Sequence, residues 1–181
     1  MSTLKVLAIC GSLRRASTNM GLLRYAQAHA PEGMSITIAD IGALPFFNAD
    51  LSAKPAAATQ LFAQLAEADA LLLACPEYNY SMAPALKNAL DWASREPDNH
   101  LLAGKPVAIV GAGGGMGTSR AQYHLRQTCV YLDLHPLQKP EFFANAFAGG
   151  FDADGNLIDP KLQDMLTQQL AALRAWAARL G

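Results

Sequence analysis

Charge of either sign is scarce in this sequence, and neither sign is in excess. The 181 residues include 14 lysines and arginines and 15 aspartates and glutamates, which gives a formal net charge of −1. No run of lysines and arginines supplies a local basic patch either. Nucleic acids and anionic membranes attract proteins through such basic surfaces, so neither is an expected partner.

Long hydrophobic runs, cysteine pairs and metal-ligand patterns are also missing. No apolar run approaches the roughly 20 residues that span a bilayer, and the first residues show no secretory-signal pattern. Cys10, Cys75 and Cys129 are far apart, so we expect small buried thiols and not disulfides. The four histidines show no metal-ligand spacing with one another or with the cysteines, so no metal site is expected. These features predict a cytoplasmic globular protein.

The two best-known phosphate loops are absent as well. Only Gly11 precedes the first predicted helix, whereas the dinucleotide fingerprint G-x-G-x-x-G needs three glycines. No Gly-Lys-Ser or Gly-Lys-Thr occurs, which excludes the nucleotide-triphosphate loop G-x-x-x-x-G-K-[ST]. A pyrophosphate must lie against bare backbone. A phosphate loop in this chain would use side chains instead, which suits a terminal monophosphate better.

The segment 11–19, Gly-Ser-Leu-Arg-Arg-Ala-Ser-Thr-Asn, has such side chains. It lies between an apolar strand pattern at 4–10 and a helical pattern, where free amide groups and the positive end of the helix dipole attract anions. The candidate donors are Ser12, Arg14, Ser17, Thr18 and Asn19. We therefore predict a phosphate cradle for a mononucleotide. The alternative is an ordinary connection in which Ser17 or Thr18 caps the helix and both arginines lie in solvent.

Strand and helix patterns alternate along the chain. Strands are predicted at 4–10, 34–39, 68–75, 105–110 and 135–138, and helices at about 19–30, 56–67, 85–95, 118–132 and 160–180. This alternation predicts one α/β domain over 1–181, with a parallel sheet covered by helices on both faces. Ligands bind such sheets beyond the carboxyl ends of the strands. Three of these ends carry unusual sequence, at 11–19, 76–82 and 111–117.

The second and third of these segments suit a flat ligand. Pro76 cannot extend a strand ladder, so we expect an irregular loop over Pro76-Glu77-Tyr78-Asn79-Tyr80-Ser81. Its backbone and phenol rings could support an aromatic ligand, and the alternative is an edge loop whose tyrosines pack on the adjacent helix. Five glycines between 111 and 117 let the backbone approach a ligand closely, although glycine loops also serve as simple connections.

Two other groups of side chains allow more than one interpretation. Phe46 and Phe47 lie in an irregular segment, 41–55, and we expect them to fill the core, with a ligand mouth as the alternative. One face of a predicted helix carries Arg120, Tyr123, His124 and Arg126. Such a set is usually solvated, and a subunit contact is the alternative.

In this order and separation, three motifs resemble the NAD(P)H-dependent FMN reductase family, and within it the bacterial quinone and chromate reductases. They are Gly11-Ser12-Leu13-Arg14-x-x-Ser17-x-Asn19, Pro76-Glu77-Tyr78-Asn79-Tyr80-Ser81 and Leu86-Lys87-Asn88-Ala89-Leu90-Asp91-Trp92. Gln122-Tyr123-His124-Leu125-Arg126-Gln127 and Lys139-Pro140-Glu141-Phe142 also look like that subgroup. The resemblance covers most of the chain, and the C-terminal helix is its least distinctive part.

The resemblance implies a fold, a cofactor and a set of binding residues. The fold would be a flavodoxin-like three-layer sandwich with a five-stranded parallel sheet of order 2-1-3-4-5, and FMN would be held noncovalently. Its phosphate would be bound by Ser12, Arg14, Ser17 and Asn19, with Thr18 and Met20 close by. The isoalloxazine ring would lie along Pro76, Glu77, Tyr78 and Asn79, with Gly113, Gly114 and Gly115 at its other edge.

The implied activity is that of an oxidoreductase. NADPH or NADH would donate a hydride, and a small acceptor such as a quinone, chromate, an azo compound or free flavin would then take its place in a ping-pong mechanism that needs no catalytic side chain. Members of the family are homodimers or homotetramers. One alternative is a flavodoxin-like electron carrier, although a net charge of −1 does not suit docking on protein partners. The other is a flavin-free enzyme or regulator that holds a different phosphate ligand in the cradle.

Overall fold

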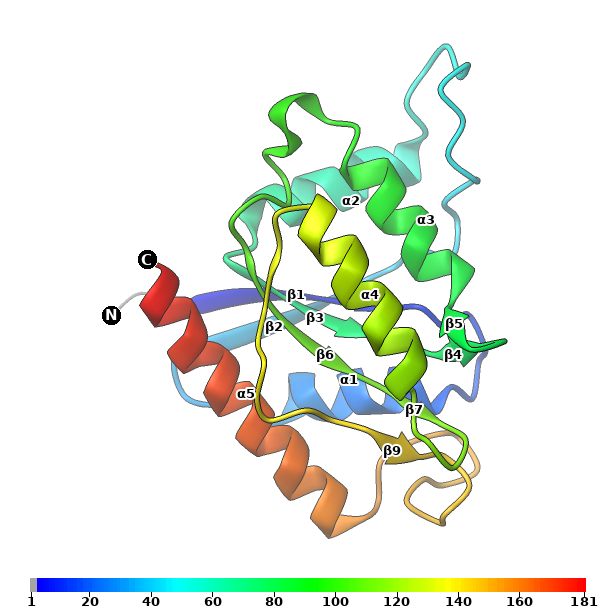
Figure 1. Ribbon diagram of the computed structural model, residues 1–181, viewed down its shortest axis with the longest axis vertical. Coiled ribbons are helices and arrows are strands. Elements are labelled where there is room, and N and C mark those ends of the chain that lie inside the picture. The colour runs from blue at the N-terminus through cyan, green and yellow to red at the C-terminus, as the bar shows by residue number, and fades with distance from the viewer. Residues whose placement is uncertain (1–2) are drawn as a thin grey trace.

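The centre of the structure, a computed structural model that describes residues 3–181, is a five-stranded parallel sheet (Figure 1). Its strands are β1 (Leu4–Cys10), β2 (Met34–Ala39), β3 (Ala70–Ala74), β6 (Pro106–Val110) and β8 (His135–Pro136). They are arranged in the order β2-β1-β3-β6-β8. Counted among the sheet strands alone, this is the order 2-1-3-4-5, so the predicted topology is confirmed.

The hydrophobic pattern of each strand depends on whether one or both of its faces are buried. Strands β3 and β6 are buried along their whole length, and they read as continuous apolar runs because both faces of the sheet are covered. In the central register, Ile9 pairs with Ala39 on one side and Leu73 on the other, and Leu73 pairs with Ile109. Strand β2 lies at the edge of the sheet, which explains its partial alternation.

Helices cover the sheet on both faces and complete the predicted three layers (Figure 1). Helices α1 (Thr18–Ala28) and α5 (Pro160–Leu180) pack on one face, and α2 (Ala56–Glu67), α3 (Pro84–Ala93) and α4 (Ser119–Tyr131) pack on the other. Alternate side chains of β1 separate in the same way, because Leu7 and Ile9 join the core under α2, α3 and α4, whereas Ala8 joins the core under α1 and α5. A three-residue 3-10 turn, η1 (Pro97–Asn99), follows α3.

Two small ribbons lie at the carboxyl edge of the sheet. Strands β4 (Glu77–Tyr78) and β5 (Ser81–Met82) form an antiparallel hairpin, and β7 (Ala112–Gly113) pairs in parallel with β9 (Ala144–Asn145). The irregular loop expected after Pro76 is therefore wrong. The chain does leave the main sheet there, but Asn79 and Tyr80 take φ values of 51° and 67°, which allows the tight two-residue turn that a hairpin requires.

Residues 40–55 form no helix or strand, as expected, but their two phenylalanines differ. Phe47 packs edge-on against Trp92, with 5.2 Å between the ring centroids. The backbone is fixed beside it, because the indole N–H of Trp92 donates to the carbonyl oxygen of Pro45 at 2.8 Å. The prediction of a core residue is confirmed for Phe47 and wrong for Phe46, which is 79% exposed.

All three cysteines are free and buried, as predicted. Burial raises the pKa of Cys10, and it raises the pKa of both Cys75 and Cys129 to about 12. No helix formed by residues 3–181 is long and apolar enough to cross a membrane.

We expect the folded protein to resist thiol reagents at neutral and mildly alkaline pH. The thiolate is the reactive form, and a group with a pKa of about 12 is deprotonated in only about one molecule in 10⁴ at pH 8. Ellman's reagent at pH 8 should therefore report no thiol within minutes in buffer and three in denaturant. Fast release of one equivalent from the folded protein would contradict the burial of these side chains.

Candidate functional site

Three loops meet at the carboxyl edge of the sheet, as the sequence predicts. They follow β1, β3 and β6, which are neighbours in the sheet. Backbone hydrogen bonds join the loop starts, because the Gly11 N–H donates to the Ala74 oxygen at 2.9 Å and the Cys75 N–H donates to the Val110 oxygen at 2.8 Å. The three segments therefore share one site, which is the usual ligand position in open α/β sheets.

The first loop ends in a capped helix with free donors. Ser17 is the N-cap of α1, because its hydroxyl oxygen accepts the Met20 N–H at 3.2 Å. The hydroxyls of Ser12 and Ser17 are buried, and the N–H groups of Thr18 and Asn19 have no backbone or side-chain acceptor among residues 3–181. The capping alternative and the cradle thus describe the same geometry, and the cap leaves two amides open to an anion.

Arg14 is exposed beside these donors, as is Arg15. In the part of the chain that the structure describes, neither guanidinium is paired with a carboxylate. Both line a cleft of about 490 Å³ between the first loop and the end of β2, together with Ser12 and the half-buried Met20. Of the predicted phosphate ligands and their neighbour Met20, the cleft therefore brings together Ser12, Arg14 and Met20, whereas Ser17, Thr18 and Asn19 do not line it.

Asn19 has a role that the sequence pattern did not indicate. Its side chain is 4% exposed and forms two hydrogen bonds with one residue of the third loop. The amide Nδ2 donates to the Ala112 oxygen at 2.8 Å, and the Oδ1 accepts the Ala112 N–H at 3.0 Å. Asn19 therefore joins the first loop to the third, and its backbone N–H is its free donor toward the cradle.

A turn that is distant in sequence supports the cradle from behind. Gly155, with φ of 78°, lies so close to the backbone of Ser17 that an added Cβ would be 2.8 Å from the Ser17 carbonyl carbon. A Cβ on Gly21, in the first turns of α1, would lie 1.8 Å from the Gly155 oxygen. This contact was not predicted from sequence, where the pair of glycines is its one signal.

Hydrogen bonds hold that turn against α1. The Arg24 Nε donates to the Asn156 Oδ1 at 2.9 Å. The Asp152 carboxylate accepts the N–H groups of Asp154 and Asn156 at 3.0 and 2.8 Å. Hydrogen bonds, first of all from the Asn156 side chain, lower the pKa of Asp152. The turn at 152–156 is therefore held in a fixed position against the start of α1.

The hairpin of the second loop is held by α4. The Glu77 Oε1 lies 2.5 Å from the Arg120 Nη2, and the Arg120 guanidinium stacks 3.8 Å from the centre of the Tyr80 ring. A second hydrogen bond joins the Ser81 hydroxyl to the His124 Nδ1 at 2.9 Å.

The solvated helix face expected from sequence is wrong for Arg120 and Arg126, which are half-buried and bound to other elements. Arg120 and His124 contact the hairpin, and the Arg126 Nη2 donates to the Leu137 oxygen at 3.0 Å. Tyr123 is 65% exposed and His124 is exposed as well, so these two residues fit that expectation. The two contacts with the hairpin leave no local sequence pattern, because they join residues about 40 positions apart.

The glycines of the third loop serve two purposes. Gly111 is required by packing, because a Cβ there would lie 1.9 Å from the Thr118 Oγ1, beneath the loop. A Cβ at Gly114 or Gly115 would meet nothing within 4 Å. The space beside those two residues is open, although the protein itself would tolerate side chains there. This arrangement fits a backbone that approaches a flat ligand.

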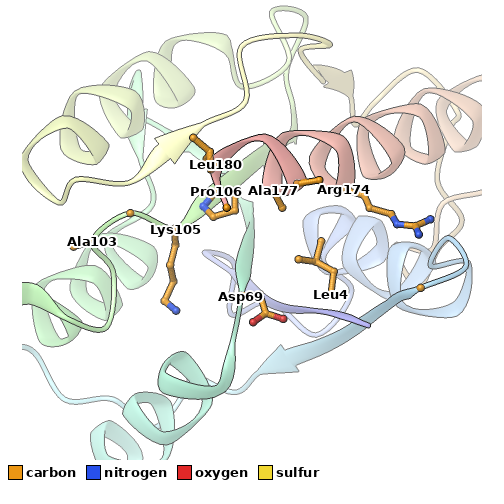
Figure 2. A pocket seen from close by; sticks show the side chains of 12 residues that line it. Leu4, Asp69, Ala103, Lys105, Pro106, Arg174, Ala177 and Leu180 are labelled. Carbon is orange, nitrogen blue, oxygen red and sulfur yellow. The ribbon is translucent and has the colours of Figure 1, made fainter. Parts of the chain in front are cut away.

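A second hollow lies at the opposite edge of the sheet and is separate from the three loops (Figure 2). It has a volume of about 540 Å³ and is lined by Leu4, Asp69, Lys105 and Arg174, among others, at the starts of β1, β3 and β6. Burial lowers the pKa of Lys105, whose ammonium donates to the Ala68 oxygen. None of the predicted cofactor-binding residues lines this hollow.

The donor set at the carboxyl edge suits FMN. Buried hydroxyls, two free amides and an exposed guanidinium suit a phosphate monoester, and the open space beside Gly114 and Gly115 suits a ligand that approaches the backbone closely. No group of three or more His, Cys, Asp or Glu side chains in the described residues is placed to hold a metal ion.

Fold and site together define a flavodoxin-like flavoenzyme, and comparisons with known proteins identify the family. The model of the NADPH-dependent FMN reductase family matches residues 4–149, and the chain belongs to that family. The NAD(P)H-dependent FMN reductase of Pseudomonas aeruginosa is 52% identical over 180 residues, which cover 98% of this chain and 97% of that relative. The quinone reductase of Escherichia coli is 39% identical over 183 residues, or 98% and 97% of the two chains.

A solved structure supports the same conclusion. The flavoenzyme NAD(P)H:(acceptor) oxidoreductase from Paracoccus denitrificans superimposes with a TM-score of 0.88 at 31% identity, covering 98% of this chain and 99% of that one. The chain is therefore an NAD(P)H-dependent oxidoreductase that uses FMN. The resemblance inferred from the motifs is confirmed.

The turn behind the cradle gives a test of the site's architecture. We expect Gly155→Ala to lower the free energy of unfolding by about 2–4 kcal/mol, because it combines backbone strain with a clash against Ser17. Gly149→Ala is the matched control: its φ is 79° and its Cβ would meet nothing within 4 Å, so it should cost only the strain of about 1–2 kcal/mol. Equal losses for the two variants in urea unfolding would show that Gly155 does not support the cradle.

Proposed function

We propose that FMN binds noncovalently with its phosphate in the first loop. The ligands are Ser12, Arg14, Ser17, Thr18 and Asn19, with Met20 close by. The proposal is supported by the buried hydroxyls, by the free amides of Thr18 and Asn19, and by a guanidinium with no carboxylate partner in the described chain. Charge-assisted hydrogen bonds from a planar guanidinium are the strongest of these contacts.

The second and third loops are proposed to hold the isoalloxazine ring between them. Pro76, Glu77, Tyr78 and Asn79 form one wall, and Gly113, Gly114 and Gly115 form the other. The support is their origin at the ends of neighbouring strands, β3 and β6, together with the open space beside Gly114 and Gly115. Tyr78 is 42% exposed, so part of its side chain is accessible at this wall.

We propose that the enzyme transfers electrons from NADPH or NADH to quinones. Bound FMN supplies hydride acceptance and two-electron release. The chain's own residues bind the phosphate, orient the ring and leave one side open, and no side chain is proposed to act as a nucleophile. Donor and acceptor are proposed to occupy the open side in turn, which predicts ping-pong kinetics. Chromate, azo compounds and free flavin are further candidate acceptors.

The assembly is proposed to be a homodimer or homotetramer of one-domain subunits, 1–181, in the cytoplasm. Large side chains are exposed on the hairpin and along α4: Tyr80 is 66% exposed, Val130 82% and Tyr131 77%. Exposed large apolar and aromatic side chains of this kind are typical of protein interfaces. Sedimentation equilibrium of the holoenzyme distinguishes a dimer from a tetramer, and a monomer would contradict the proposal.

The observation that carries the proposed function is the convergence of the cradle, the hairpin and the glycine loop at one edge. The decisive experiment is a visible spectrum after incubation with FMN and desalting, followed by anaerobic addition of NADPH or NADH. We expect retained flavin to bleach and then to recover when a quinone is added. Retained flavin that neither donor reduces would support an electron carrier instead. Protein without flavin would overturn the site assignment.

Arg14 provides a direct test of the cradle. Arg14→Ala should weaken FMN binding by about 1.5–3 kcal/mol, or roughly 10- to 150-fold, because it removes a charged hydrogen bond to the phosphate. Arg15→Ala is the matched control, since Arg15 is adjacent, exposed and equally unpaired in the described chain, and it should change the affinity less than about threefold, the scale of a screened surface charge. A fluorescence titration of FMN measures both. An unchanged affinity in Arg14→Ala would remove Arg14 from the site.

A further inference from the structure

Glu77 has an unusual environment for a residue of a ligand-binding wall. Its side chain is only 7% exposed, although it is the first residue of the hairpin at the mouth of the site. Both carboxylate oxygens are already engaged by α4: the Oε1 pairs with the Arg120 Nη2 at 2.5 Å, and the Oε2 accepts the Ala121 N–H at 3.3 Å. The carboxylate is therefore directed at the helix.

Arg120 is the only cation paired with this carboxylate in the described residues, and it is fixed in place. Its guanidinium lies 3.8 Å from the centre of the Tyr80 ring, and its Nε is buried without an acceptor in the described chain. The Arg120 guanidinium thus contacts Glu77, which precedes the turn, and Tyr80, which lies in it. A buried carboxylate that loses its only cation becomes an uncompensated charge.

The turn of the hairpin, Asn79 and Tyr80, lies between the contacts that α4 makes with Glu77 and with Ser81. Asn79 and Tyr80 both have positive φ, which a two-residue hairpin turn requires and which is strained for a bulky residue such as Tyr80. The contacts here come from α4, through Arg120 and through the hydrogen bond between His124 and Ser81. Contacts with α4 therefore help to hold the hairpin in its observed conformation.

We propose that Arg120 is a positioning residue for the flavin, acting through Glu77 and Tyr80; this rests on the proposed function. It holds residues 77–80 in the shape of the ring wall and neutralises the carboxylate behind that wall. FMN gains electrons, and with them negative charge, when it is reduced. A nearby uncompensated carboxylate disfavours the more negative form. Arg120 therefore keeps the midpoint potential of the bound flavin higher than Glu77 alone would allow.

The test compares Arg120→Met, Glu77→Gln and the double variant as FMN-loaded proteins, by flavin affinity and by the midpoint potential of the bound flavin. Arg120→Met should bind oxidised FMN several-fold more weakly and should bind reduced FMN a further tenfold more weakly, a fall in potential of about 30 mV for a two-electron couple. The double variant should recover most of that fall, because the uncompensated charge is gone. A merely structural loss would not be restored by removing the second charge.

Two further variants keep the test decisive. Arg120→Lys retains the cation without the planar stack, so its potential should stay close to that of the wild type while its FMN affinity falls. Arg179→Met is the matched control, because Arg179 also stacks on an aromatic ring, that of Trp176 at 5.7 Å, at the far end of α5 with no carboxylate partner in the described residues. It should change neither quantity. Thermal unfolding shows whether each variant is folded.

The outcomes separate the two proposals. Wild-type protein that holds no FMN, or FMN that NADPH and NADH cannot reduce, overturns the proposed function and this inference with it. Wild-type protein that behaves as expected, beside an Arg120→Met variant of equal affinity and potential, overturns the inference alone. The inference alone is also overturned if Arg120→Met lowers the potential and the double variant does not restore it.

Discussion

The site depends on the alignment of three buried parallel strands. Strands β1, β3 and β6 are neighbours, and backbone hydrogen bonds continue past their ends, from Gly11 to Ala74 and from Cys75 to Val110. Both faces of these strands are covered, so a shift by one residue would move every core side chain to the opposite face. The alignment is thereby fixed, and it brings three loops that are distant in sequence to one edge. Without it the chain would have three unrelated loops.

Each loop is then supported by a segment that belongs to another part of the chain. Asn19 joins the first loop to Ala112, and Gly155 lies against the backbone of Ser17. The hairpin is held by α4 through Arg120. A cofactor site needs ligand-contacting groups that are held in place before the ligand arrives. Here that rigidity comes from the buried hydrogen bonds of the Asn19 side chain, from the close contacts of the glycines and from one ion pair.

These contacts between the loops and the rest of the chain also explain why few polar side chains at the site are without a partner within the protein. The side-chain amide of Asn19 and the carboxylate of Glu77 are occupied within the protein. What remains for the ligand is the hydroxyl groups, the backbone N–H groups at the start of α1, and Arg14. This distribution suits an enzyme whose hard chemistry belongs to its cofactor, because the protein's part is then binding, orientation and electrostatics.

The order of the elements could be predicted from sequence alone, and the same local patterns predict an anion-binding loop after the first strand. Continuous apolar runs predict strands buried on both faces, and a hydroxyl-rich segment before a helix predicts exposed donors; both are local properties. The hairpin at 77–82, the exposure of Phe46 and the engagement of Arg120 were decided only by the tertiary structure. The turn at Asn79 and Tyr80 is held by contacts with α4, some 40 residues further along the chain. Such contacts leave no local pattern, because they depend on which helix the sheet order places beside the loop.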